Sequence, residues 1–407
     1  MQTQLADFLR GTQTGNDIER ILRSCVHCGF CNATCPTFSL LGHELDGPRG
    51  RIYQIKTFVE TGTVTETVQN HLDRCLTCLS CTTTCPSGVE YNHLIDMGRE
   101  LVEQRIDRPL PQSMLRWVLR KLLPYRRRFA FFLGVGRLCR PLLPASLRAK
   151  IPEKRAGMTH MPASHTRKML MLDGCVQPAL TPTTNEAAAL VFDRLGIEVV
   201  RVAQAACCGA VSQHLMEPVE AQDHMRRNID AWWPHVEAGA EAILVTASGC
   251  GVMVKDYAWH LRHDMLCRDK AKRISGLCVD PVEVLAREDI DALRVEDTRA
   301  IAFHAPCTLQ HGQKLKGRVE SLLKRLGFRL VEVRDAHQCC GSAGTYAILQ
   351  PEISTQLRTL KLDSLEREQP DVIATANVGC QTHLDAGTQT PVVHWLELIA
   401  GYPATSP

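Results

Sequence analysis

The fold of this chain is decided by CVHCGFCNATCP at residues 25–36, a pattern repeated fifty residues later as CLTCLSCTTTCP at residues 75–86. In each run the first three cysteines are three residues apart, so their thiolates can bind different irons of one 4Fe–4S cubane. The fourth cysteine follows a longer step, precedes a proline and is directed toward the other cluster. We therefore predict a ferredoxin-like N-terminal domain with two clusters. The predicted ligands are Cys25, Cys28, Cys31 and Cys85 for the first cluster, and Cys75, Cys78, Cys81 and Cys35 for the second.

Zinc is the main alternative for so many thiolate ligands. Zinc sites usually pair two C-x2-C knuckles, whereas each run here is a quartet that ends in proline, so clusters are favoured over zinc and over uncoordinated structural cysteines. The insert between the runs has a Gly/Pro turn, followed by apolar residues at helical spacing at Ile52, Ile55 and Val59. This pattern predicts an all-helical two-cluster domain over residues 1–104 instead of the compact β-containing ferredoxin.

Composition supports metal or redox chemistry. The chain has 407 residues, enough for two or three domains, and 19 of them are cysteine. A secreted disulfide scaffold would be smaller and would follow a signal peptide, and the first twenty residues have neither the basic nor the apolar part of one. No apolar run approaches the roughly 18 residues that a membrane span needs.

A basic stretch follows the cluster domain. Residues 105–155 hold fourteen Lys and Arg against two acidic residues, although the net charge of the whole chain is only +3. Recurrent prolines predict a linker of short amphipathic helices over residues 105–165. Basic helices with aromatic residues suit an anionic membrane surface, and an acidic partner subunit is an equal alternative. We expect no nucleic acid, because no nucleic-acid-binding motif accompanies the charge.

The rest of the chain is an internal duplication of an α/β unit, over residues 166–296 and 297–407. In each copy an apolar strand runs into a cysteine, a helical segment and a second strand follow, then a Cys-Cys-Gly, and a third strand ends at a last cysteine. Cysteines at the carboxyl ends of parallel strands lie where such sheets bind ligands. The first copy has Cys175, Cys207, Cys208 and Cys250, and the second has Cys307, Cys339, Cys340 and Cys380.

The role of these eight cysteines stays open between a further iron–sulfur cluster, redox-active thiols and structural cysteines. A disulfide between adjacent cysteines such as Cys339 and Cys340 would be strained and easily reduced. For the nearby histidines we expect a hydrogen-bonding or surface role before a ligand role; they are His304, His311, His337 and His383. The remaining cysteines outside any motif are expected to be buried small hydrophobes; they are Cys139, Cys267 and Cys278.

Both quartets, the segment GPRGRIYQIK and the two C…CCG…C copies together resemble the iron–sulfur subunits of bacterial glycolate oxidases. HLDRCLTC, ASGCG, HAPCTLQH, CCGSAGTY and TANVGCQTHL favour this family over related cysteine-rich subunits, and the resemblance covers residues 20–396. In heterodisulfide reductases each copy ends in a C-x2-C pair. Here Ala247 and Asn377 replace the first cysteine of that pair.

The resemblance implies an electron-transfer subunit of a flavin-dependent 2-hydroxy-acid dehydrogenase that converts glycolate to glyoxylate. No dinucleotide fingerprint or P-loop is present, so FAD is expected on a partner flavoprotein and no catalytic residue is assigned to this chain. Electrons would leave to a quinone, and the complex would lie peripherally on the cytoplasmic face of the inner membrane. The alternatives are a D-lactate or anaerobic glycerol-3-phosphate dehydrogenase subunit, a catalytic subunit like heterodisulfide reductase, and an assembly scaffold.

Overall fold

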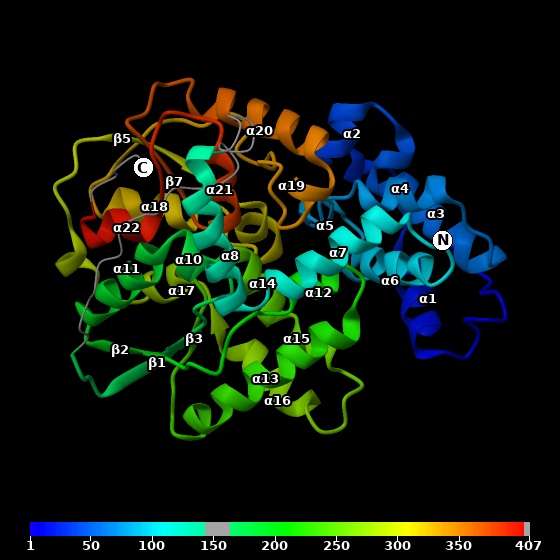
Figure 1. Ribbon diagram of the computed structural model, residues 1–407, viewed down its shortest axis with the longest axis horizontal. Coiled ribbons are helices and arrows are strands. Elements are labelled where there is room, and N and C mark those ends of the chain that lie inside the picture. Colours follow the sequence, from blue (N-terminus) through cyan, green and yellow to red (C-terminus); the bar gives the residue numbers. More distant parts are fainter. Residues whose placement is uncertain (143–162, 403–407) are drawn as a thin grey trace.

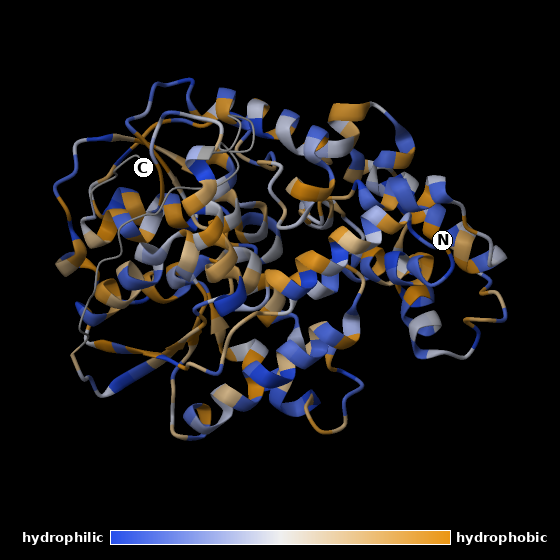
Figure 2. Cartoon of the chain, in the orientation of Figure 1, coloured by the Kyte–Doolittle hydropathy of each residue, from blue (hydrophilic) through white to orange (hydrophobic). Residues whose placement is uncertain are grey.

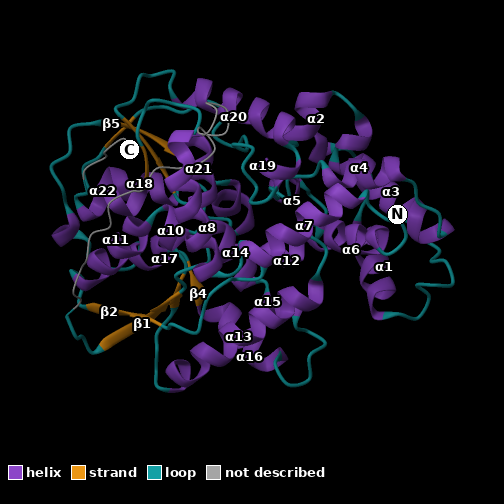
Figure 3. Cartoon of the chain, in the orientation of Figure 1, coloured by secondary structure: helices purple, strands orange, loops and turns teal. Residues whose placement is uncertain are grey.

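The structure, a computed structural model, describes residues 1–142 and 163–402. Its N-terminal part is helical throughout the described residues, as the insert between the cysteine runs predicts (Figures 1 and 3). The helices of this part are α1 Gln13–Ser24, α2 Pro36–Leu41, α3 Pro48–Thr61, α4 Glu66–Asp73, α5 Ser80–Thr84 and α6 Tyr91–Glu103.

Helix α3 is the central helix of the N-terminal core. It begins at Pro48, whose missing N–H costs nothing at a first turn, and ends at Gly62 in the left-handed conformation. Ile52, Ile55 and Val59 are buried on one face, as their spacing predicts. They pack with residues of α1 and α6 in one apolar cluster that also contains Cys25, Cys75 and Cys81. The cysteine runs are therefore anchored to a core of their own.

Two further helices continue from the N-terminal part toward the C-terminal part (Figure 1). They are α7 Leu110–Leu122 and α8 Arg126–Cys139. Only Leu119 of α7 and no residue of α8 is buried, so both helices lie on the surface of the described structure. The remainder of the predicted linker, from residue 143 to residue 162, lies outside the described residues.

The C-terminal part contains two parallel sheets of the same topology. The first has the order β2-β1-β3-β4 and the second the order β6-β5-β7-β8, with every pair parallel. This arrangement confirms the predicted duplicated α/β fold. The strands are β1 Arg167–Met171, β2 Ile197–Arg201, β3 Ile243–Leu244, β4 Cys278–Val279, β5 Ala300–His304, β6 Arg329–Leu330, β7 Val372–Thr375 and β8 Val392–His394.

Helices cover both sheets. Those of the first copy are α10 Gln177–Leu180, α11 Pro182–Asp193, α12 Ala210–His214, α13 Pro218–Glu237, α14 Ser248–Lys255, α15 Tyr257–His260, α16 Arg268–Leu277 and α17 Pro281–Leu285. Those of the second copy are α18 Arg318–Arg325, α19 Tyr346–Leu349, α20 Pro351–Leu365, α21 Val378–Asp385 and α22 Trp395–Ala400.

The two copies share one apolar core. It joins residues of the first sheet, such as Met169 and Leu244, with residues of the second, such as Ile301 and Val372. His394 at the end of β8 reaches across the boundary, its Nε2 lying 3.1 Å from the backbone oxygen of Thr246. The copies are therefore packed as one unit. Among the described helices none combines the length and the apolarity that crossing a bilayer requires.

Candidate iron–sulfur centres

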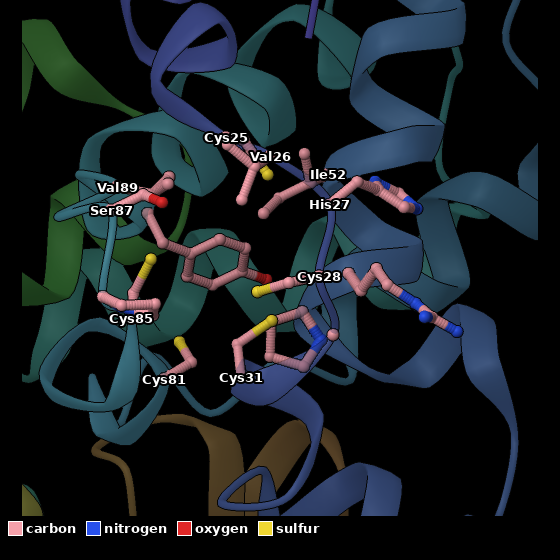
Figure 4. A pocket seen from close by; sticks show the side chains of 15 residues that line it. Cys25, Val26, His27, Cys28, Cys31, Ile52, Cys81, Cys85, Ser87 and Val89 are labelled. Carbon is pink, nitrogen blue, oxygen red and sulfur yellow. The ribbon is translucent and has the colours of Figure 1, made fainter.

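The four predicted ligands of the first cluster surround one cavity. Cys25, Cys28, Cys31 and Cys85 line it together with Cys81. Figure 4 shows the sulfur atoms of these residues pointing toward the same space. The thiols come from the loop after α1, the turn before α2 and the end of α5. Cys85, the fourth cysteine of the second run, thus converges with the first three cysteines of the first run, as its longer step predicts, although the ligand assignment itself stays a prediction.

The thiols around this cavity suit a cationic iron cluster. Burial raises the pKa of Cys31 to about 11, and the neighbouring Cys25 adds to the shift. Burial likewise raises the pKa of Cys25, while its neighbours Cys85 and Cys28 act in the same direction. Four thiolates cannot form side by side in such surroundings without a positive charge among them, and cluster iron supplies that charge.

The second quartet lies deeper in the protein. Cys35, Cys75 and Cys81 are buried and Cys78 is half-buried. Burial raises the pKa of Cys78 and Cys81 well above the usual range, and neighbouring thiols of the same quartet contribute. The structure therefore brings the second predicted set together as well, with Cys81 between the two groups.

Two buried arginines compensate the charge of this second quartet. Burial alone would raise the pKa of Cys75, but the guanidinium groups of Arg51 and Arg99 outweigh it and hold this pKa below its usual value. Arg51 donates to the backbone oxygen of His71 at 2.8 Å and to Thr37 Oγ1 at 3.1 Å. Arg99 donates to the backbone oxygen of Cys75 at 2.6 Å.

Sequence reasoning missed both arginines. Each occupies a position on the apolar face of its helix, Arg51 four residues before Ile55 and Arg99 four residues after Ile95. An arginine at a core position of an amphipathic helix was the available signal, because charged residues are rarely buried without a partner.

The second quartet adjoins the second cysteine-rich copy. Cys78 packs against a buried cluster that contains Leu76, Cys307 and Cys339. Tyr346 of that cluster donates its hydroxyl to the backbone oxygen of Arg74 at 3.0 Å. A polar contact lies nearby, with Thr83 Oγ1 and His311 Nδ1 2.8 Å apart. The predicted cysteines of the second copy are thus next to those of the second cluster.

Each Cys-Cys-Gly turn is built in the same way. The glycine N–H donates to the first thiol, from Gly209 to Cys207 Sγ and from Gly341 to Cys339 Sγ, at 3.4 Å in both copies. Gly341 has φ +86°, and a Cβ there would lie 2.4 Å from the backbone oxygen of Ser354. Both the left-handed backbone and the close helix make glycine necessary.

The thiols of each copy are gathered at the carboxyl ends of the strands. In the first copy Cys207 interacts with Cys175 and Cys208, and Cys208 interacts with Cys250. In the second copy Cys339 interacts with Cys307 and Cys340, and Cys340 interacts with Cys380. The structure thus assembles both predicted groups, and which of the three open roles they serve stays undecided by this arrangement alone.

The expectations for the cysteines outside any motif are met only in part, whereas two of the histidines have the expected hydrogen bonds. Cys278 is buried as expected, but Cys139 is exposed on α8, so its predicted burial is wrong; α8 turns that side chain away from the core. His383 Nε2 lies 3.2 Å from Ser354 Oγ, and His304 Nδ1 lies 2.9 Å from Thr375 Oγ1, which are the hydrogen-bonding roles expected for them.

Comparison with known families agrees with this construction. Residues 21–89 match the model of a 4Fe-4S dicluster domain, and residues 169–255 and 301–385 each match the model of a cysteine-rich domain. The glycolate oxidase iron-sulfur subunit of Escherichia coli is 53% identical over 400 residues, which cover 98% of each chain.

A second relative is more distant. Lactate utilization protein A of Geobacillus thermodenitrificans is 26% identical over 246 residues, 57% of this chain and 98% of that protein. The helical two-cluster domain, the duplicated cysteine-rich copies and the end-to-end match together identify the family, and the chain belongs to the glycolate oxidase iron–sulfur subunits.

Proposed function

We propose that this chain is the electron-transfer subunit of a flavin-dependent 2-hydroxy-acid dehydrogenase, with glycolate as the substrate oxidised on a separate flavoprotein subunit. The observation that carries the proposal is the placement of the two cysteine quartets. One lies at a cavity where Cys28 is exposed, and the other lies deeper in the protein, where its member Cys78 packs against a cluster that contains Cys307. When bound there, 4Fe–4S clusters supply one-electron transfer.

The protein's own residues suit this role. Cys28 at the exposed cavity offers a place where a partner subunit can approach the first quartet, and Cys81 lies between the first and second quartets. Cys78 of the inner quartet packs against the apolar cluster that contains Cys307 and Cys339. Substrate chemistry needs a two-electron acceptor, which places the flavin on the partner.

The test is a pair of cysteine variants in the complex purified with its flavoprotein. We expect Cys28→Ser to alter one cluster's EPR signal and to abolish turnover with a quinone analogue, while glycolate still reduces the flavin. Cys139→Ser is the matched control, because Cys139 is also exposed but lies on α8 outside both quartets. Loss of flavin reduction in an assembled Cys28→Ser complex contradicts the electron-transfer role.

Substrate identity is tested on the same complex. Its glycolate, D-lactate and glycerol-3-phosphate activities are compared by the rate of flavin reduction. We expect glycolate to give the highest kcat/KM, and the proposal is wrong in its substrate if either of the other two does.

We also propose that the complex rests peripherally on the cytoplasmic face of the inner membrane and passes electrons to a quinone. Helices α7 and α8 support this with exposed apolar side chains. In Figure 2 the cartoon of α7 carries segments in the orange of hydrophobic residues. On α8 alone Phe131, Phe132 and Leu138 are 66%, 56% and 80% exposed. Exposed basic residues such as Arg127 accompany them, the combination that binds an anionic lipid surface.

The expected basic surface is smaller than the sequence predicts, because intramolecular partners hold several of its cations. Arg126, for example, lies 3.3 Å from Asp173. The apolar residues are therefore the sharper targets for a test of membrane binding.

Sedimentation with vesicles of phosphatidylglycerol and phosphatidylethanolamine tests this surface. We expect the double variant Phe131→Glu, Phe132→Glu to release the complex, and added salt to weaken binding of the unaltered complex. Leu266→Glu is the control, since Leu266 is 89% exposed on the segment between α15 and α16. Equal sedimentation of the double variant and the control contradicts membrane binding through α8.

A further inference from the structure

A pocket of about 380 Å³ lies between the N-terminal helices and the first cysteine-rich copy. One wall is mainly α6, and the other consists of α12, α13, α15 and the segment after α15; these four helices are labelled in Figure 1. The pocket shares no lining residue with the cavity at the first quartet. Pockets for small organic ligands have this size and often lie at a boundary between domains.

The pocket adjoins two groups of thiols. Helix α6 begins at Tyr91, whose hydroxyl donates to Cys75 Sγ of the inner quartet at 3.7 Å, and His93 of the pocket wall follows two residues later. On the opposite wall, α12 begins directly after the Cys-Cys-Gly turn of the first copy. His214, the last residue of α12, acts on the charge of Cys208. A molecule in this pocket is therefore close to the inner quartet and to the thiols of the first copy.

The second copy provides an internal comparison. Cys208 and Cys340 are 132 residues apart, and the same displacement places Tyr346 opposite His214. Tyr346 is buried in the apolar contact with the inner quartet, so the second copy is sealed against the N-terminal helices at this position. In the first copy His214 Nδ1 instead lies 3.9 Å from Asp96, which lines the pocket. The fold therefore does not by itself require an open space here.

Contacts across the boundary hold the two walls in place. His93 Nε2 of α6 lies 2.9 Å from Asp256 of the first copy, and the ring of His93 stacks on Trp259 with centroids 3.9 Å apart. At the side of α1, Arg262 pairs with Asp17 at 2.6 Å. The pocket is thus formed before any ligand binds.

The charges of the walls favour a neutral ligand. Two arginines line the pocket, but the guanidinium of Arg226 is paired with Asp264 at 2.7 Å, and that of Arg262 is held at the side of α1. Asp96 and Glu100 add negative charge from successive turns of α6. An anionic ligand would meet this negative charge and find both guanidinium groups already occupied.

The polar groups of the walls suit carbonyl oxygens. Burial and the neighbouring Asp96 raise the pKa of Glu100, so its carboxyl keeps a proton more readily and can donate it. Gln213 and His93 are 7% and 9% exposed, and one polar atom of each has no hydrogen-bond partner among the described residues. Buried polar atoms without partners are costly, and a ligand in the pocket that both residues line can supply the missing contacts.

An apolar rim joins the pocket to the surface proposed to meet the membrane. Pro218 and Val219 line the pocket, and Val219 is 69% exposed. The preceding Glu217 pairs with Arg120 of α7 at 2.7 Å, which holds this rim against α7. Trp117 of the same helix is 53% exposed. An apolar chain that leaves the pocket at Val219 therefore meets the exposed apolar side chains of α7.

We propose that this pocket binds the headgroup of a quinone, whose isoprenoid tail leaves past Val219 along α7. The site rests on the proposed function, in which a quinone accepts the electrons. Reduction of one quinone to its quinol consumes two electrons, which come from glycolate through the proposed relay, and two protons. Glu100 donates one proton to a quinone oxygen, and solvent at the open side supplies the second proton and reprotonates Glu100.

Photolabelling of the complex purified with its flavoprotein tests the site without relying on turnover. A short-chain benzoquinone that carries an azido group is photolysed on the complex, and the labelled peptides are identified by mass spectrometry. We expect label on the segments that contain Glu100 or Gln213, with a yield that saturates as the quinone concentration rises. Label confined to other segments overturns the proposal.

Variants then test the polar groups. Glu100→Gln and Gln213→Leu should each raise the half-saturating quinone concentration about tenfold, the effect of one lost hydrogen bond. Glu320→Gln is the matched control, because Glu320 is also a half-buried helical glutamate whose pKa burial raises, but it lies on α18 outside the pocket. Half-saturation of both pocket variants at the same concentration as the control overturns the proposal.

Ferricyanide separates this site from the proposed function. As a small one-electron acceptor it can react at the exposed cavity of the first quartet, so it does not need the pocket. If glycolate reduces ferricyanide through the unaltered complex while the azidoquinone leaves the pocket unlabelled, the site is wrong and the electron-transfer role stands. If glycolate does not reduce the flavin, the proposed function is wrong, and the labelling still decides whether the pocket binds a quinone.

Discussion

At the scale of single residues, cysteine spacing predicts where the thiols meet, because four ligands of one cluster must lie within a few ångströms of each other. The charges that accompany them are harder to predict. Arg51 lies beside Cys75 and Cys35 and is 1% exposed, whereas Arg49, two residues earlier, is half-buried and pairs with Glu44. Only the folded chain shows which arginine faces the quartet, since that choice depends on contacts with α4 and α2.

Arg51→Met should lower the reduction potential of the cluster at Cys75. Removing a buried positive charge makes the addition of an electron less favourable, by about 60 mV if the lost interaction is about 1.4 kcal/mol. Potentiometric EPR titration measures the shift. Arg51→Lys keeps the charge and should recover most of it, and Arg23→Gln on the exposed surface of α1 should change nothing. Equal potentials for the methionine and lysine variants would contradict the electrostatic role.

Gly341→Ala should destabilise the second copy by about 3 kcal/mol, because it adds a steric clash to the penalty of a left-handed backbone. Its Cβ would lie 2.4 Å from Ser354 O, and helix α20 would have to move. Gly327→Ala separates the two effects: Gly327 has φ +98° but open space around its Cβ, so only about 1 kcal/mol is expected. Urea unfolding measures both variants, and equal losses would argue against the clash.

At the scale of elements, the sequence predicts most of what the structure contains. Alternating apolar strands and helical segments are local patterns, and they predicted the duplicated sheets and helix α3 correctly. The two helices of the basic stretch were expected as well, but their ion pairs were not. Arg108 of this stretch pairs with Asp73 of α4, 35 residues earlier, and no local pattern reports such a partner.

Asp73→Asn should loosen the attachment of α7 to the N-terminal domain. The carboxylate of Asp73 accepts from Arg108 at 2.6 Å and from Arg116 at 3.2 Å, and these side chains are only 4% and 11% exposed. Removing its charge leaves Arg116 without the carboxylate it pairs with and Arg108 with Glu103 alone, at 2.7 Å, which costs about 3 kcal/mol.

Chemical unfolding with a probe on α7 measures this cost. Asp7→Asn is the control, since Asp7 and Arg10 form an ion pair with both side chains largely exposed, and a change below about 0.5 kcal/mol is expected. An equally small change for Asp73→Asn would mean that Arg108 and Arg116 are satisfied by water.

At the scale of the whole molecule, the apolar cores divide the chain into an N-terminal unit and one C-terminal unit that contains both cysteine-rich copies. The sequence suggests two separate cysteine-rich copies, but a single core joins Met169 and Leu244 to Ile301 and Val372. The N-terminal helices have a core of their own that includes Cys25, Cys75 and Cys81. The hydrophobic pattern of the sequence predicts which face of each helix or strand is buried. It does not predict which of these faces pack together in one core, because that depends on the tertiary structure.

Removal of iron should therefore affect the two units unequally. In the N-terminal unit the cysteines are part of the apolar core, and without iron their thiols become buried polar groups with few partners. The shared core of the two copies contains no cysteine. We expect hydrogen exchange of the iron-free chain to lose protection in α3 and α6 while β1, β5 and β7 stay protected. Unfolding should change from one transition to two. Simultaneous loss of protection in the helices and both sheets would contradict this prediction. It would show that the contact between Cys78 and Cys307 makes the whole chain one cooperative unit.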